Sequence, residues 1–138
     1  QGLNVQYQSS AVEELEHQYD VVLALEIIEH VTDPQKFVRS VLRKVKPGGM
    51  AIFSTLNRTR KSYLLGVVAA ERLLGWVPAG THEWKKFVKP SELARFCRAE
   101  NAEVQNISGL VYHPLQDQFS ISKTDVSINY FMSVSFAD

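Results

Sequence analysis

Two carboxylates and one imidazole lie within five positions of one another: Glu26, Glu29 and His30 directly follow an apolar run. Carboxylate oxygens and an imidazole nitrogen are ligands that a hard divalent cation accepts, and imidazole also carries protons near neutral pH. If the turn is helical, spacings of three and four place all three groups on one face. In a structural role, a glutamate would instead cap a helix and the histidine would be held by hydrogen bonds. The residue types therefore predict metal ligands or proton carriers, with a structural role as the alternative.

The elements around these three residues place them at the edge of a sheet. Residues 21–25 form an apolar run typical of a buried parallel strand, and the strand is expected to span 19–25. Asp33 and Pro34 have the residue types of a helix N-cap and first helical residue, and the helix should continue to about Lys46. Open α/β sheets bind ligands at the carboxyl ends of their strands, so a ligand site is expected here.

The rest of the chain also fits one sheet with helices on its faces. Pro47-Gly48-Gly49 is expected to end the first helix. The other expected elements are a strand at 3–8, a helical turn at 11–15, a strand at 50–55, a helix from about 89 to 99 and long strands at 102–112 and 127–136. No helix separates the last two strands, which predicts that they pair antiparallel.

Composition limits the class of protein. The chain has 138 residues, 45% of them hydrophobic, which is enough for one domain with a core. Fifteen basic and 15 acidic residues cancel, so nothing in the overall charge indicates nucleic acid as a partner. The single cysteine, Cys97, excludes an internal disulfide framework and is expected to be buried. No secretory signal or transit peptide is visible at the start of the sequence.

An apolar insertion flanked by cations occupies residues 58–88. Its apolar stretch is interrupted by Glu71 and Arg72 and is shorter than the ~20 residues that a helix needs to cross a bilayer. Cations lie on both sides of this stretch: Arg58, Arg60 and Lys61 before it, and Lys85 and Lys86 after it. With these cations facing anionic headgroups, the insertion could lie on a membrane surface or cover an apolar substrate tail. An ordinary buried helix is the alternative.

Short motifs distributed along the chain resemble one enzyme family. Lys46-Pro47-Gly48-Gly49 before an apolar strand resembles the second half of class I S-adenosylmethionine-dependent methyltransferases. The narrower resemblance is to the O-methyltransferases of ubiquinone biosynthesis, and it rests on the motifs at 26–31, 53–58, 61–63, 77–82, 86–90 and 129–130. It implies an α/β fold: the C-terminal part of a Rossmann-like sheet, mostly parallel, with an antiparallel C-terminal pair.

The resemblance also implies roles for single residues. Leu25 would contact the cofactor S-adenosylmethionine, with a core leucine as the alternative. Glu26, Glu29 and His30 would hold a divalent cation, expected to be Mg²⁺, that orients a catechol and acts as a Lewis acid. His30 could instead be the catalytic base that removes the phenolic proton, and the two roles compete for one lone pair. The implied reaction is O-methylation of a polyprenylated catechol or benzoquinol hydroxyl in ubiquinone biosynthesis.

The resemblance covers this chain but only the C-terminal half to two-thirds of the family domain. No glycine-rich turn follows a strand, and Gly48-Gly49 precedes one. We therefore expect residues 1–138 to form a single, partial methyltransferase domain. A catalytically silent lipid-binding or scaffolding module, and a small-molecule methyltransferase unrelated to quinones, are the alternatives.

Partners and location follow from the same resemblance. The expected partners are a polyprenylated phenolic substrate, a membrane contacted peripherally through 58–88, and a quinone-biosynthesis complex, with no nucleic acid. The expected location is the matrix face of the mitochondrial inner membrane, or the bacterial cytoplasm in association with the membrane.

Overall fold

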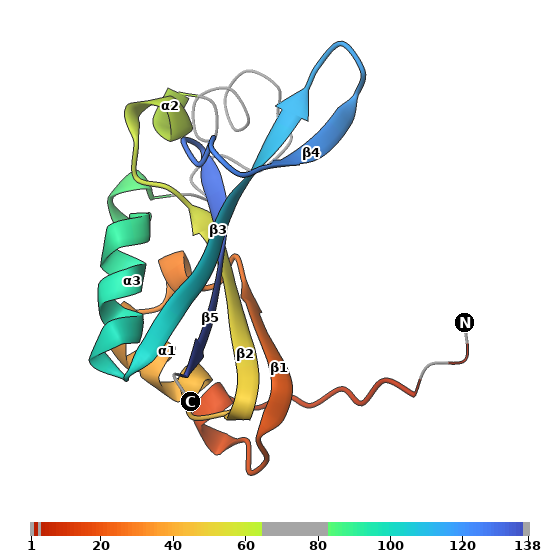
Figure 1. The fold of residues 1–138 in the computed structure, drawn as a ribbon, viewed down its shortest axis with the longest axis vertical. Coiled ribbons are helices and arrows are strands. Elements are labelled where there is room, and N and C mark those ends of the chain that lie inside the picture. Colours follow the sequence, from red (N-terminus) through yellow and green to blue (C-terminus); the bar gives the residue numbers. More distant parts are fainter. Residues whose placement is uncertain (1, 3, 65–82, 137–138) are drawn as a thin grey trace.

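A five-stranded sheet with helices packed on it makes up the computed structural model, which describes residues 2, 4–64 and 83–136. The strand order is β1-β2-β5-β3-β4 (Figure 1). The strands are β1 (Tyr19–Leu25), β2 (Val45–Leu56), β3 (Ala102–His113), β4 (Gln118–Ser122) and β5 (Asn129–Phe136). The helices are α1 (Pro34–Leu42), α2 (Arg60–Ser62) and α3 (Pro90–Ala99), with short 3₁₀ turns η1 (Val12–Glu14), η2 (Ile28–His30) and η4 (Trp84–Lys86).

The sheet is mixed. β1 and β2 pair in parallel, whereas β5 pairs antiparallel with both β2 and β3, and β3 pairs antiparallel with β4. The α/β class and the antiparallel C-terminal pair are thus confirmed, and parallel pairing among the described strands is confined to β1 and β2. The carboxyl ends of these two strands lie together, which fixes the place of the candidate site.

The start of α1 follows the prediction, but its end does not. The Asp33 carboxylate accepts a hydrogen bond from the backbone N–H of Lys36 at 3.0 Å, as an N-cap residue does. The helix ends at Leu42 instead of near Lys46, because Val45 is already buried and paired with β1. The expectation of a helix to about residue 46 is therefore wrong at its C-terminal end.

The Pro47-Gly48-Gly49 segment belongs to β2 and does not end a helix. Gly48 has a φ of +73°, a conformation that side chains with a Cβ rarely adopt. A Cβ on Gly49 would lie 2.6 Å from the carbonyl oxygen of Asp20 in β1. The two glycines therefore let the start of β2 bend closely against β1, where the pairing register shifts between Tyr19 and Val21.

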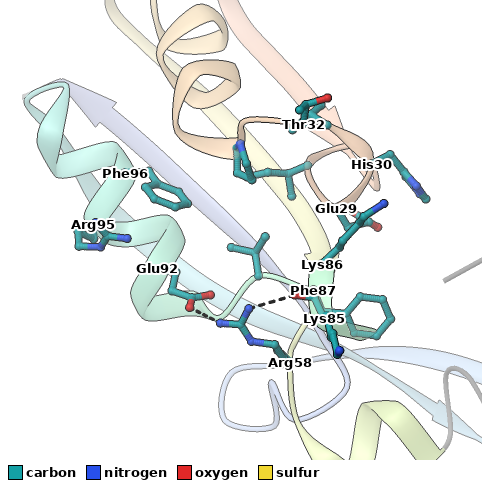
Figure 2. A pocket seen from close by; sticks show the side chains of 14 residues that line it. Glu29, His30, Thr32, Arg58, Lys85, Lys86, Phe87, Glu92, Arg95 and Phe96 are labelled. Atoms are coloured by element: carbon teal, nitrogen blue, oxygen red, sulfur yellow. Dashed lines mark hydrogen bonds and ion pairs between the residues drawn. The ribbon is translucent and has the colours of Figure 1, made fainter. Parts of the chain in front are cut away.

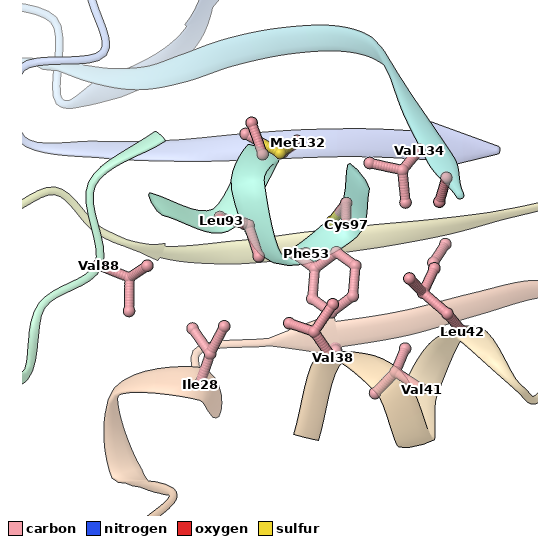
Figure 3. Packing of buried hydrophobic residues seen from close by; sticks show 14 of the residues in the cluster. Ile28, Val38, Val41, Leu42, Phe53, Val88, Leu93, Cys97, Met132 and Val134 are labelled. Carbon is pink, nitrogen blue, oxygen red and sulfur yellow. The ribbon is translucent and has the colours of Figure 1, made fainter. Parts of the chain in front are cut away.

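One face of the sheet carries the hydrophobic core. Figure 1 shows α1 and α3 on the same side of the strands. Phe53 of β2 is fully buried there and lies among Val38 of α1 and Leu93 and Cys97 of α3 (Figure 3). The predicted burial of Cys97 is confirmed, and burial raises the pKa of its thiol to about 12.

The opposite face of β1 is apolar and exposed. Alternate residues of this strand point away from the helices, and Val21, Leu23 and Leu25 are exposed together with Met50 of β2. A buried parallel strand was expected at 19–25. Its bounds are confirmed, but in the described structure only Val22 and Ala24 are covered, and the other residues of the strand are exposed.

Elsewhere, one expected strand is absent from the described residues, one strand was not expected, and the role of the 58–88 insertion is not tested. Residues 4–8 form no strand, so the expectation of one at 3–8 is wrong for its described part, and β4 was missed. Most of the 58–88 insertion, residues 65–82, lies outside the described residues, which leaves its membrane role untested. Among the helices that the structure describes, none is both long and apolar enough to span a membrane.

Candidate active site

Glu26 occupies the first position after β1, in an unusual backbone conformation. Its φ is +52°, a region that costs energy for any residue other than glycine and is often found at functional sites. The backbone N–H donates to the carbonyl oxygen of Ser54 at 3.0 Å, and the Ser54 hydroxyl donates to Oε1 of Glu26 at 2.7 Å. Ser54 at the end of β2 thus holds both the backbone and the carboxylate of Glu26.

Glu29 lies in η2 and is buried, with 3% of its surface exposed. The Thr55 hydroxyl donates a hydrogen bond to its Oε2 at 2.8 Å. The other carboxylate oxygen, Oε1, is also buried and has no hydrogen-bond partner among the described residues. A buried carboxylate with one satisfied oxygen and one unsatisfied oxygen is costly, so this atom is a strong candidate for ligand contact.

Ser54 and Thr55 separate the two glutamates. They are consecutive residues of β2, so their side chains point to opposite faces of the sheet. Glu26 is bound on the exposed apolar face and Glu29 on the helix-covered face. In the described part of the chain, no three His, Cys, Asp or Glu side chains lie close enough together to hold a metal ion. The side chains of Glu26, Glu29 and His30, which were expected on one face of a turn, are therefore not brought together in this structure.

The other two predicted site residues lie near these glutamates. His30 is exposed at the end of η2 and lines the same pocket as Glu29. Leu25 is the last residue of β1, pairs with Ser54, and is 43% exposed on the apolar face. Neither placement tests the role predicted for the residue, but both leave the side chain accessible to a ligand.

A pocket of about 440 Å³ opens between η2, α3 and the segment that precedes α3 (Figure 2). Its apolar lining includes Phe87 and Phe96. Its charged lining consists of the carboxylates of Glu29 and Glu92 and the cations of Arg58, Lys85, Lys86 and Arg95. Four cations and two carboxylates line the pocket although the chain as a whole is neutral. Arg58 pairs with Glu92 and Lys86 pairs with Glu83, so the preference of the pocket for ligands that carry or develop negative charge rests on Lys85 and Arg95.

Arg58 fixes one wall of this pocket. Its guanidinium pairs with the carboxylate of Glu92 in α3 and donates to the backbone carbonyl of Lys85 at 3.2 Å (Figure 2). Close by, the Trp84 indole N–H donates to the carbonyl oxygen of Thr59 at 2.9 Å. These contacts attach η4 to the end of β2 and so position Lys85 and the residues after it.

Sequence reasoning missed the site residues that contribute no conspicuous chemistry of their own. Ser54 and Thr55 were noted only as part of a family motif. Two consecutive hydroxyl side chains at the end of a strand could have indicated hydrogen bonds to the nearby carboxylates. Arg58 and Lys85 entered only as cations flanking the insertion. Arg95 could not have been found, because only the packing of α3 brings it to this pocket.

The sheet, with its site at the carboxyl ends of the parallel strands β1 and β2, defines a class I methyltransferase fold. A solved structure from Thermotoga maritima, described as an S-adenosylmethionine-dependent methyltransferase and possible histamine N-methyltransferase, matches it with a TM-score of 0.67. The match covers 93% of this chain and 62% of that one, at 16% sequence identity. The family model for the methyltransferase domain matches residues 3–107, and the chain belongs to this family.

Two curated relatives with the same name share nearly half of their aligned residues with this chain. The chain is 48% identical to the ubiquinone biosynthesis O-methyltransferase of Rickettsia bellii, over 95% of this chain and 55% of that protein. It is 47% identical to the protein of the same name from Idiomarina loihiensis, over 96% of this chain and 56% of that protein. The chain thus spans about half the length of the curated relatives that it matches.

Proposed function

We propose that this chain is part of an S-adenosylmethionine-dependent O-methyltransferase that methylates a hydroxyl of a polyprenylated catechol or benzoquinol in ubiquinone biosynthesis. The observation that carries the proposal is the 48% identity, over nearly the whole chain, to a protein of that name. Leu25 is exposed at the carboxyl end of β1, which supports a cofactor contact at this edge of the sheet. The pocket with excess cations supports an acceptor that develops negative charge.

The proposed reaction needs no covalent enzyme intermediate. The acceptor oxygen attacks the methyl carbon, the sulfur–methyl bond breaks, and S-adenosylhomocysteine leaves. His30 takes the hydroxyl proton as general base, because it is exposed at the pocket and within the same turn as Glu29. Arg58 and Lys85 lie on the pocket wall, where positive charge favours the phenolate form of the acceptor.

A divalent cation, expected to be Mg²⁺, is a separate part of the proposal. Two carboxylates and an imidazole suit a hard cation by donor type. As placed, however, Ser54 and Thr55 hold the two carboxylates on opposite faces, so the arrangement does not fit a shared ion and no step above depends on one. Calorimetric titration with MgCl₂ tests it: saturable binding that Glu29→Gln weakens supports a site here, and an absence of binding heat contradicts it.

Membrane contact through 58–88 also remains a prediction. The described ends of this insertion support it, since Leu64 is 58% exposed and lies near Lys61. Flotation with anionic liposomes is the test. Serine at Leu64, Leu65, Leu73 and Leu74 should abolish lipid binding, and unchanged flotation would exclude a membrane role for the insertion. The quinone-biosynthesis complex and the mitochondrial or bacterial location stay predictions as well.

Titration with S-adenosylmethionine separates the enzyme from a silent lipid-binding module. We expect binding by the protein extended upstream to the full length of its relatives, followed by methyl transfer to a catechol. If neither the chain nor the extended protein binds the cofactor, the enzyme proposal fails and the silent module is favoured. Methyl transfer to simple phenols with no response to a polyprenyl tail would favour a small-molecule methyltransferase instead.

A further inference from the structure

The hairpin of β3 and β4 has an exposed apolar face. Phe119 and Ile121 of β4 are 64% and 63% exposed, and they lie on one face because side chains alternate along a strand. Their partners in β3 are Tyr112 and Leu110, so four apolar side chains share this face. Figure 1 shows the hairpin extending beyond the rest of the sheet. A contiguous apolar face that is exposed in this way marks an interaction surface.

Hydrogen bonds within the hairpin hold its tip in a defined position. Leu115 lies in the turn between the two strands and is 96% exposed. The backbone N–H of Gln116 closes this turn by donating to the carbonyl oxygen of His113 at 3.1 Å. The Tyr112 hydroxyl donates to Oδ1 of Asp117 at 2.7 Å. The exposure of the leucine is therefore a property of a closed turn and does not result from a frayed end.

The tip lies at the same edge of the sheet as the candidate active site. β3 and β2 both run antiparallel to β5, so β3 points in the same direction as β2 and its carboxyl end reaches the same edge. α2 lies at this end of the molecule as well (Figure 1). Tyr63 and Leu64, which follow α2, are 42% and 58% exposed. The apolar hairpin and the described start of the 58–88 insertion are thus at one end of the protein.

Two side-chain contacts fasten the base of the hairpin to α2. Lys61 of α2 pairs with Asp125, in the connection between β4 and β5, at 3.3 Å. The hydroxyl of Thr59, the N-cap of α2, donates to the carbonyl oxygen of Ser127 in the same connection at 2.6 Å. The hairpin and the start of the insertion are therefore held relative to each other, and a surface that meets one also meets the other.

The charges at this end favour an anionic partner. Among the described residues, Arg60, Lys85 and Lys123 are exposed cations that form no ion pair, and the hairpin offers the carboxylate of Asp117 against them. A second copy of the chain would bring the same cations to the contact and would be repelled. Anionic headgroups would be attracted, and acyl chains below them accept apolar side chains.

We propose that the β3–β4 hairpin is a membrane-binding element, which places Leu115, Phe119 and Ile121 in the interface of a bilayer that contains anionic phospholipids. The inference rests on the membrane contact proposed above for residues 58–88 and adds a second, separate point of contact to it. Two points of contact fix the orientation of the protein on the membrane, with the carboxyl ends of β1 and β2 toward the lipid.

Flotation of the full-length protein with vesicles of phosphatidylcholine and phosphatidylglycerol tests the hairpin. With the insertion intact, Phe119→Ser combined with Ile121→Ser should lower the ratio of vesicle-bound to free protein by about tenfold or more, because two apolar side chains no longer enter the lipid. Gln118→Ala combined with Ser120→Ala changes the opposite face of the same strand and should leave the ratio unchanged. Circular dichroism checks that all variants are folded.

A second measurement keeps Phe119 and Ile121 in place. A fluorophore sensitive to its environment, attached at Leu115→Cys, should shift its emission to the blue when vesicles are added. The same fluorophore attached at Glu103→Cys, an exposed position near the start of β3, should show no shift. An unchanged emission at Leu115→Cys would overturn the inference.

The remaining outcomes separate this inference from the other proposals. Flotation that depends on the insertion alone, with no effect of the two hairpin serines, would overturn the hairpin as a contact and support 58–88. A dimer in the absence of vesicles that the same serines dissociate would also overturn it, because a second copy would then cover the face. Flotation that depends on the hairpin, by a protein that transfers no methyl group, would support the membrane surface while the enzyme proposal fails.

Discussion

The Tyr130 hydroxyl of β5 donates a hydrogen bond to the backbone carbonyl of Val88 at 3.0 Å, and both residues are buried. Val88 lies between η4 and α3 and lines the pocket that contains Glu29. One buried side chain of the sheet thus holds the segment that forms a wall of the candidate site. Burial is the main cause that raises the pKa of Tyr130, so the hydroxyl remains a donor well above neutral pH.

Replacing this hydroxyl should destabilise the fold measurably. Tyr130→Phe leaves the Val88 carbonyl buried without its donor, and we expect the free energy of unfolding to fall by about 1–3 kcal/mol. Urea unfolding followed by circular dichroism measures the change. Tyr112→Phe, which removes an exposed hydroxyl bound to Asp117, is the control and should cost less than about 0.5 kcal/mol. Equal losses in the two variants would contradict the assigned role.

Arg58→Met should loosen η4 more than it destabilises the whole protein. The Arg58–Glu92 pair is partly exposed, so its loss should lower the free energy of unfolding by no more than about 1 kcal/mol. The guanidinium also holds the carbonyl of Lys85, so the N–H groups of Lys86 and Phe87 should exchange with deuterium about tenfold faster. Lys46→Met, which breaks a more exposed pair with Asp20, should leave these rates unchanged.

Cys97 should be unreactive while the protein is folded. Burial is the main cause that raises the pKa of its thiol to about 12, so almost no thiolate exists at pH 8 and the sulfur is also inaccessible. We expect reaction with a disulfide reagent to be at least about a hundredfold slower than for a free thiol. The same sample in concentrated guanidinium should react fully. Rapid labelling of the native chain would show that α3 opens readily.

Asp125 should contribute to stability in a defined pH range. Hydrogen bonds from Ser127, aided by Lys61 at 3.3 Å, hold the pKa of Asp125 at about 2, below the usual value of 3.8. A carboxyl whose pKa is lower in the folded state stabilises the fold above its unfolded pKa, and this contribution disappears as the pH falls from about 4 to about 2. The unfolding temperatures of the chain and of the Asp125→Asn variant should differ most above that pH range and should converge at its lower end. A constant difference would exclude this linkage.

The sequence predicted most elements because their local signals agree with the packing. The Asp33-Pro34 start of α1 and the exact span of β1 are determined by nearby residues, and both are confirmed. The end of α1 was not predictable in this way, because pairing with β1 draws Val45 into a strand. Residues 4–8 alternate like a strand but pair with no other described strand, which an alternation pattern alone does not reveal.

For the candidate site, the sequence indicated the turn but not the arrangement of its side chains. Glu26, Glu29 and His30 do follow the carboxyl end of β1, as predicted. Their division between two faces depends on Ser54 and Thr55, which are more than 20 residues away in the sequence. Contacts between distant residues are decided by the pairing of strands, so residue spacing within the turn could not predict them.

The register in which β1 pairs with β2 determines the face of the sheet on which each of the two glutamates is bound. Leu25 lies opposite Ser54, and a slip of a single residue would exchange the faces on which Ser54 and Thr55 stand. Each hydroxyl would then meet the side of the sheet that holds the other carboxylate. Gly48 and Gly49 allow the shift of register that precedes this pairing. A glycine pair at one end of β2 thus helps determine which oxygen atoms face a ligand at the other end.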